Sequence, residues 1–67
     1  MIQVTVNGAE RRFGSPVRLL SLLEEMNMAG KKIAVERNGE IVPRSLHAET
    51  LVEDGDRLEI VVAVGGG

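Results

Sequence analysis

The chain has 67 residues, a length that suits one small domain and not two. It has no cysteine, so neither disulfides nor thiolate metal sites can stabilise it, and its fold must rest on packing. Eight basic residues against ten acidic ones give a net charge of −2, and Phe13 is the only aromatic residue. This composition argues against nucleic-acid binding, which depends on a basic face and often on stacking aromatics.

The sequence also argues against a membrane protein. No apolar run approaches the roughly 18 to 20 residues of a membrane span. Residues 1–4 begin a strand pattern and lack the charged start of a signal peptide. We therefore expect a cytoplasmic protein that binds neither membranes nor nucleic acid.

A β-hairpin is predicted at the start of the chain. Apolar and polar residues alternate over residues 2–7, which is the period of a strand with one buried face. Asn7-Gly8 then supplies the two positive-φ residues of a type I′ turn. Residues 10–13 are expected to return antiparallel to the first strand.

An amphipathic helix is predicted next. Ser15-Pro16 is a helix-start signal, with serine at the N-cap and proline at the first helical position. The apolar stripe that follows has the spacing of one helix face and consists of Leu19, Leu22, Leu23 and Met26. Gly30 is expected to cap the end of the helix. Such a stripe is more typical of a core than of a docking surface.

A second, shorter hairpin is predicted around Asn38-Gly39, between a strand that begins at residues 33–35 and a returning strand at 40–42. Residues 45–52 have mixed composition and weak periodicity, so we expect irregular structure there, with room for a single helical turn. The acidic cluster at residues 53–56 predicts a turn.

The last strand is predicted over residues 57–64 and is the most apolar of the chain. Leu58, Ile60 and Val62 share one of its faces, and Glu59, Val61 and Ala63 share the other. Apolar residues on both faces suit a central strand beside the first one. The order of elements predicts an α+β fold over residues 1–64, with one helix packed across a mixed sheet of four or five strands.

The chain closes with Gly65, Gly66 and Gly67 and a free α-carboxylate. Fixing glycines costs more backbone entropy than fixing other residues, so residues 65–67 are expected to form a flexible tail thin enough to enter a narrow channel. An α-carboxyl group has an ordinary pKa of about 3.3 to 3.7, so it is an anion at neutral pH and a poor electrophile until activated. The chain has no phosphate-binding loop and no cysteine nucleophile. Any activation of this carboxylate must therefore come from a partner.

Four segments carry a family resemblance, at residues 38–45 (NGEIVPRS), 47–50 (HAET), 53–56 (EDGD) and 64–67 (VGGG). With the order of strands and helix, they resemble the ubiquitin-like β-grasp proteins and, more narrowly, the ThiS family of sulfur carriers in thiamine thiazole synthesis. The resemblance covers essentially the whole chain. Gly66 and Gly67 match the double glycine of the family, and Gly65 is an additional residue.

The resemblance implies a protein cosubstrate and not an enzyme, with no catalytic residue, metal or bound cofactor of its own. A ThiF-like adenylyltransferase would use ATP to adenylate the carboxylate of Gly67. A persulfide donor such as a cysteine desulfurase would then convert the adenylate to a thiocarboxylate, which would supply sulfur to a ThiG-like thiazole synthase. Gly65 and Gly66 would enter the active site of the partner.

Val61, Ala63 and Val64 are candidate docking residues. Val61 and Ala63 belong to the face opposite the helix, immediately before the glycines, and an exposed apolar patch there would mark a docking site. The alternative is that a loop or a second layer covers them.

Other polar residues are given structural interpretations. His47 has no cysteine or second histidine with which to form a zinc site. The acidic pairs at residues 24–25 and 53–54 are interpreted as solvated. Residues 54–56 lack the ligand count of a calcium loop.

Three other functions are compatible with these features. The small subunit of molybdopterin synthase also looks β-grasp and ends in Gly-Gly, although the short chain and Val42-Pro43-Arg44 favour the thiamine carrier. A ubiquitin-like modifier would be joined through Gly67 to lysine amines. A plain interaction domain with an incidental, frayed glycine end would be unaffected by its removal.

Overall fold

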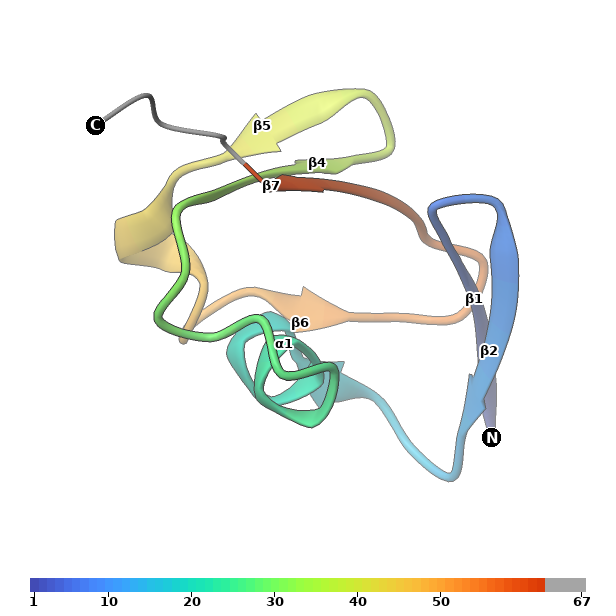
Figure 1. Cartoon of the computed structure of the whole chain (residues 1–67). Coiled ribbons are helices and arrows are strands. Elements are labelled where there is room, and N and C mark those ends of the chain that lie inside the picture. Colours follow the sequence, from blue (N-terminus) through green and yellow to red (C-terminus); the bar gives the residue numbers. More distant parts are fainter. Residues whose placement is uncertain (63–67) are drawn as a thin grey trace.

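A mixed five-stranded sheet curves around one helix in the computed structural model, which describes residues 1–62 (Figure 1). The strand order is β2-β1-β7-β4-β5. The helix is α1 (Leu19–Glu25). The strands of the sheet are β1 (Ile2–Val6), β2 (Ala9–Phe13), β4 (Ile33–Arg37), β5 (Glu40–Val42) and β7 (Arg57–Val62). The predicted α+β architecture, with one helix packed across four or five strands, is confirmed. Its predicted boundary at residue 64 lies outside the described residues.

Both hairpins form at the predicted turns. Asn7 and Gly8 have φ values of 50° and 82°, and β1 pairs antiparallel with β2. Asn38 and Gly39 have φ values of 52° and 86°, and β4 pairs antiparallel with β5. Positive φ at both central positions is what a type I′ turn requires, and asparagine and glycine reach it with the least strain.

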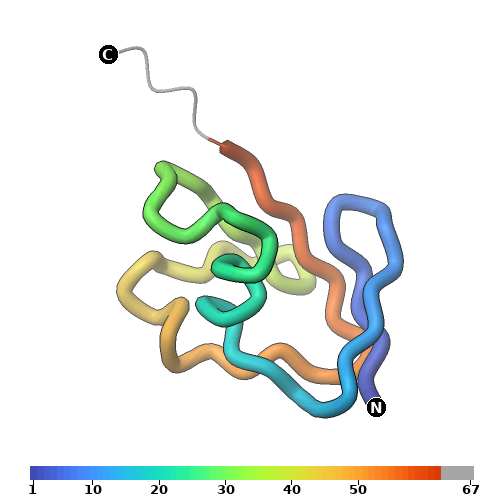
Figure 2. The backbone as a smooth tube through the Cα atoms, turned by 60° about the horizontal axis from the view of Figure 1, so that its bottom comes forward, coloured from blue at the N-terminus to red at the C-terminus, as the bar shows by residue number. Residues whose placement is uncertain are grey.

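The last strand is central, as predicted. β7 pairs parallel with β1 on one side and antiparallel with β4 on the other, and Figure 2 shows it running beside the β1–β2 hairpin. The side chain of Asn7 extends this pairing beyond the end of β1. Its Nδ2 donates to the carbonyl oxygen of Ile60 at 3.0 Å, and its Oδ1 accepts from the Ile60 N–H at 2.6 Å. Asn7 therefore holds the middle of β7 as well as forming the turn.

The helix begins later than predicted. The residue before it, Arg18, is extended (φ −76°, ψ 145°) and has no side-chain cap, so the predicted start at Ser15-Pro16 is wrong. Instead, the preceding residues form a short strand, β3 (Val17–Arg18), which pairs with β6 (Leu51–Val52). The N–H of Leu19 donates to the carbonyl oxygen of Thr50 at 2.8 Å. A segment distant in the sequence thus supplies the hydrogen-bond acceptor that a local capping side chain would otherwise provide.

The helix also ends earlier than predicted. Asn27 adopts φ 63°, and its N–H donates to the carbonyl oxygen of Glu24 at 3.0 Å. The N–H of Met28 donates to the carbonyl oxygen of Leu23 at 2.8 Å. These two bonds make a Schellman motif with asparagine in the left-handed position. The predicted cap at Gly30 is wrong, because that residue lies in the following turn.

The core lies between the sheet and α1. Half-buried side chains, including the last member of the predicted stripe, Met26, pack against it. The buried hydrophobic residues are Ile2, Val4, Val6, Leu19, Leu22, Leu23, Val35, Val52, Leu58 and Ile60. The stretch at 45–52 was expected to be irregular with room for a single helical turn, and a 3₁₀ turn (Arg44–Leu46) begins just before it, whereas β6 was not predicted. No helix within residues 1–62 has the length and apolar character of a membrane span.

Candidate partner interface on the outer face of the sheet

Val61 is the one predicted docking residue that falls within the described part of the chain. It lies near the end of the central strand, on the face of the sheet that points away from α1, and 58% of its surface is exposed. Nothing in residues 1–62 covers it. The other predicted site residues lie outside the described residues, namely Ala63, Val64, Gly65, Gly66 and Gly67.

Strand pairing places four further side chains beside Val61. Ala34 is the Cα partner of Val61, and in the next row Glu36 pairs with Glu59 on one side and with Ile41 on the other. We call these five residues the outer patch. Its second large apolar residue, Ile41, is 63% exposed. Glu59 was expected on the face of Val61 but was not predicted to take part in docking. Ala34, Glu36 and Ile41 were not predicted, because only the alternation along three strands taken with their register shows that they share this face.

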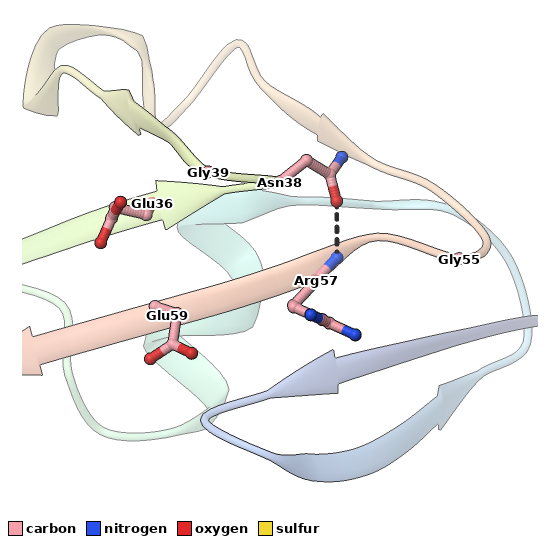
Figure 3. Close-up of a pocket in the computed structure, with 6 residues that line it drawn as sticks. All are labelled: Glu36, Asn38, Gly39, Gly55, Arg57 and Glu59. Atoms are coloured by element: carbon pink, nitrogen blue, oxygen red, sulfur yellow. Dashed lines mark hydrogen bonds between the residues drawn. The ribbon is translucent and has the colours of Figure 1, made fainter.

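The outer patch borders an open depression of about 680 Å³. Glu36 and Glu59 project from the adjacent strands β4 and β7 into this region, with Arg57 further along β7 (Figure 3). Neither glutamate forms a salt bridge within residues 1–62. The arrangement therefore offers two carboxylates and apolar surface to an approaching molecule.

A hydrogen-bond network around Asp56 holds the start of β7 in place. Asp56 is only 7% exposed, whereas Glu53 and Asp54, the pair interpreted as solvated, are exposed. The Asp56 carboxylate accepts hydrogen bonds from Glu53 N–H (2.8 Å), Arg37 Nε (2.9 Å) and Asn38 Nδ2 (3.1 Å). Asn38 Oδ1 in turn accepts from the N–H of Arg57 at 2.9 Å. The network joins the β4–β5 turn to β7 and so sets the relative position of the strands that carry the outer patch.

Burial and hydrogen bonding act on Asp56 in opposite directions. Burial disfavours the carboxylate and on its own would raise the pKa of Asp56. The hydrogen bonds from Glu53, Asn38 and Arg37, with the positive charge of Arg37, outweigh that effect and leave the pKa below its usual value. Folding therefore favours the ionised form of Asp56.

This lowered pKa predicts a loss of stability in acid. The unfolded pKa of aspartate is about 3.9, and the folded pKa is lower, so the contribution of Asp56 is complete above about pH 5 and is lost as the pH falls through the folded pKa. We expect Asp56→Asn to lower the free energy of unfolding at pH 7 by about 2 to 4 kcal/mol. The asparagine side chain brings an N–H donor to a position where the neighbouring groups already donate hydrogen bonds. The free energy of unfolding of this variant should also fall less steeply below pH 4 than that of the wild type.

Urea unfolding between pH 2 and pH 8 measures both effects. Glu49→Gln, an exposed residue whose side chain makes no hydrogen bond or salt bridge within the described chain, is the matched control and should follow the wild type. Equal acid dependence in Asp56→Asn and wild type would show that Asp56 does not carry the expected proton linkage.

His47 has a structural role. It is 5% exposed, and its Nε2 lies 3.1 Å from the carbonyl oxygen of Val42. Because a carbonyl oxygen only accepts, this contact assigns the proton to Nε2. Residues 1–62 contain no group of three or more histidine, cysteine, aspartate or glutamate side chains placed to hold a metal ion.

Comparison with known proteins identifies the family. The sequence model of the ThiS family matches residues 4–67, which is nearly the whole chain. The chain belongs to the ThiS family. The crystal structure of the thiamine biosynthesis protein ThiS from Geobacter metallireducens agrees with this ThiS-family chain at a TM-score of 0.84 and 32% identity, over 98% of this chain and 100% of that one. The resemblance on which the expected β-grasp fold rested is confirmed.

Two longer proteins contain a segment similar to this ThiS-family chain. A thiazole synthase of Paramagnetospirillum magneticum is 47% identical over 66 residues, and a thiazole synthase of Magnetococcus marinus is 30% identical over 66 residues. In both cases the match covers 98% of this chain and 20% of the relative. The chain thus spans about a fifth of the length of these two relatives and corresponds to one segment of each.

Proposed function

We propose that this ThiS-family chain is a sulfur carrier of thiamine biosynthesis, acted on by partner enzymes and not itself an enzyme. Gly67 is the residue that carries the sulfur, and Gly65 and Gly66 deliver it into the partner's active site. The observation that carries the proposal is the family match, which extends through residue 67 and so includes the Gly66-Gly67 end.

The chemistry follows from the inertness of a carboxylate. An oxygen of the Gly67 carboxylate attacks the α-phosphorus of ATP bound by the adenylyltransferase, and pyrophosphate leaves. The terminal sulfur of a persulfide then attacks the activated carbonyl carbon and displaces AMP, which forms an acyl disulfide. A thiol reduces the S–S bond and leaves the thiocarboxylate on Gly67, so that ATP drives the activation and a thiol supplies the electrons.

Three partners complete the proposal in a cytoplasmic setting. A ThiF-like adenylyltransferase binds ATP, and a persulfide donor such as a cysteine desulfurase supplies sulfur. A ThiG-like thiazole synthase consumes the thiocarboxylate, and this partner is supported by the two relatives whose names are thiazole synthase. The ThiS-family match favours this pathway over molybdopterin synthase and over protein modification.

Alkylation and mass spectrometry test the proposal. The purified chain, shown by intact mass to end at Gly67, is incubated with host lysate, ATP and cysteine and then treated with iodoacetamide at neutral pH. Because the chain has no cysteine, mild alkylation should tag only a thiocarboxylate. Alkylation is needed because replacing oxygen by sulfur changes the mass almost as much as oxidising a methionine does.

An ATP-dependent alkylated adduct at Gly67 is the expected result, with an ATP-free incubation as the control. A free carboxylate throughout, in a lysate that thiolates a known carrier, would contradict the sulfur-carrier function. Conjugates to lysine side chains of other proteins would instead indicate a modifier.

A further inference from the structure

We propose that Glu36 and Glu59 are the specificity-determining residues for docking to thiazole synthase, which meets them with an arginine or lysine side chain set among apolar groups. This inference rests on the proposed function and adds the chemistry of the docking face. The occupant of the outer patch is thus a thiazole synthase with a basic side chain at the centre of its contact surface.

The first observation is that the two glutamates face each other on adjacent strands and that neither forms a salt bridge within residues 1–62. They are Cα partners on antiparallel strands, and like charges directly opposite each other destabilise a sheet. Arg37, the cation on the same strand as Glu36, contacts Asp56 and Glu53 instead. Arg57 lies two residues before Glu59 on the same face of β7 and lines the same depression, but it forms no salt bridge with either glutamate within residues 1–62. Residues 63–67 contain no basic side chain. Two like charges placed opposite each other, with no salt bridge within the described residues, break a local rule of sheet stability, and such exceptions are expected at functional positions.

The second observation is the apolar surface around the pair. Ile41 lies beside Glu36 in the same row, and Ala34 and Val61 form the next row; all three are exposed. When a partner covers these residues, water leaves the neighbourhood of the carboxylates, and a charge-assisted hydrogen bond to a guanidinium or ammonium gains strength. Energetic centres of interfaces are enriched in arginine and are surrounded by contacts that exclude water.

The third observation is the position of the outer patch relative to Gly67. Val61 precedes Gly67 by six residues, which span at most about 20 Å when fully extended. A protein that receives sulfur from Gly67 therefore reaches the end of β7. The outer patch contains the last exposed outer-face residue of the described strand, so it lies on the surface that such a partner meets.

Two relatives favour thiazole synthase over the other partners as the protein that binds the outer patch. In two thiazole synthases, a segment similar to this chain is part of the same polypeptide. A separate carrier lacks the high effective concentration that such a linkage provides. We infer that it gains its affinity through contacts, for which the outer patch offers apolar surface and unpaired negative charge.

The variants Glu36→Gln and Glu59→Gln, alone and together, test the inference. They keep the size of the side chain and remove the charge, and Glu24→Gln is the matched control because Glu24 is exposed on α1, away from the outer patch. Binding of the full chain to the host's thiazole synthase is measured by calorimetry at 0.05 M and 0.5 M salt. Thermal unfolding of each variant is measured alone.

We expect each single substitution to weaken binding to thiazole synthase about tenfold and the double substitution about 100-fold. The Tm of the double variant should rise by about 1 to 4 °C, because a repulsive pair is removed. Salt should weaken binding of the wild type and have little effect on the double variant. Glu24→Gln should match the wild type in both measurements. A merely structural role for the two glutamates would not produce higher stability together with weaker binding.

Three results would overturn the inference. Equal affinity of double variant and wild type for thiazole synthase is the first. A loss that occurs with the adenylyltransferase and not with thiazole synthase would assign the outer patch to the other partner. Absence of wild-type binding to thiazole synthase would also overturn it, while the function proposed above would stand if Gly67 is still thiolated in lysate. Absence of thiolation would contradict that function separately.

Discussion

Removal of the three terminal glycines is expected to abolish thiocarboxylate formation, with a loss of more than 100-fold in the rate of ATP-dependent adenylation. A chain that ends at Val64 places its carboxylate about 10 Å short of its proposed position, at about 3.3 to 3.6 Å for each residue. It also presents a branched side chain where the intact chain has hydrogen. Reaction rates respond steeply to such displacement, since a shift of about 1 Å can cost about 100-fold.

The thermal stability of the truncated chain shows whether adenylation is lost because the tail is missing or because the domain is unfolded. The buried core runs from Ile2 to Ile60, so the Tm of the truncated chain should equal that of the full chain. Pyrophosphate release in the presence of the adenylyltransferase measures the rate. A chain lacking one glycine still ends in Gly-Gly, so it tests the length of the tail without changing its terminal residues. We expect its rate of adenylation to be at least tenfold lower. Normal adenylation of the chain ending at Val64 would show that the glycines do not deliver the carboxylate.

Leu58→Ala is expected to leave the protein largely unfolded at 25 °C. Leu58 is fully buried in the central strand, where β7 is paired with both β1 and β4. Replacing a buried leucine by alanine costs about 2 to 5 kcal/mol through lost burial and the cavity left behind. The single core of a domain this small supplies only about 3 to 5 kcal/mol, so the substitution removes most or all of the net stability.

Circular dichroism and urea titration measure this effect. Leu46→Ala is the control, because Leu46 lies in the 3₁₀ turn and is exposed, and its loss should change the free energy of unfolding by less than about 1 kcal/mol. A cooperative transition of Leu58→Ala with a loss below about 1 kcal/mol would show that the core is not as tightly packed around β7 as the structure indicates.

The sequence by itself determined the features that depend on neighbours in the chain. Asn7-Gly8 and Asn38-Gly39 predicted both hairpin turns, because a type I′ turn depends on the backbone preferences of two adjacent residues. The alternation along the last strand predicted that Leu58 and Ile60 face the core, since the side-chain period of a strand is two. Val62, expected on the same face, is 44% exposed. The order of these elements predicted one helix packed across a mixed sheet, and the chemistry proposed for Gly67 came from the resemblance to the ThiS family.

The tertiary structure alone decided the features that depend on residues distant in the sequence. Ser15-Pro16 is a sound local signal for a helix start, yet the helix begins at Leu19, because pairing of β3 with β6 satisfies the intervening backbone. The sequence placed Asp56 in a turn, but only the fold brings Arg37 and Asn38 close enough to donate hydrogen bonds to it. The outer patch likewise exists only because register places Glu36 opposite Glu59. Local preferences amount to about 1 kcal/mol per residue or less, so the packing and hydrogen bonds of the whole domain override them.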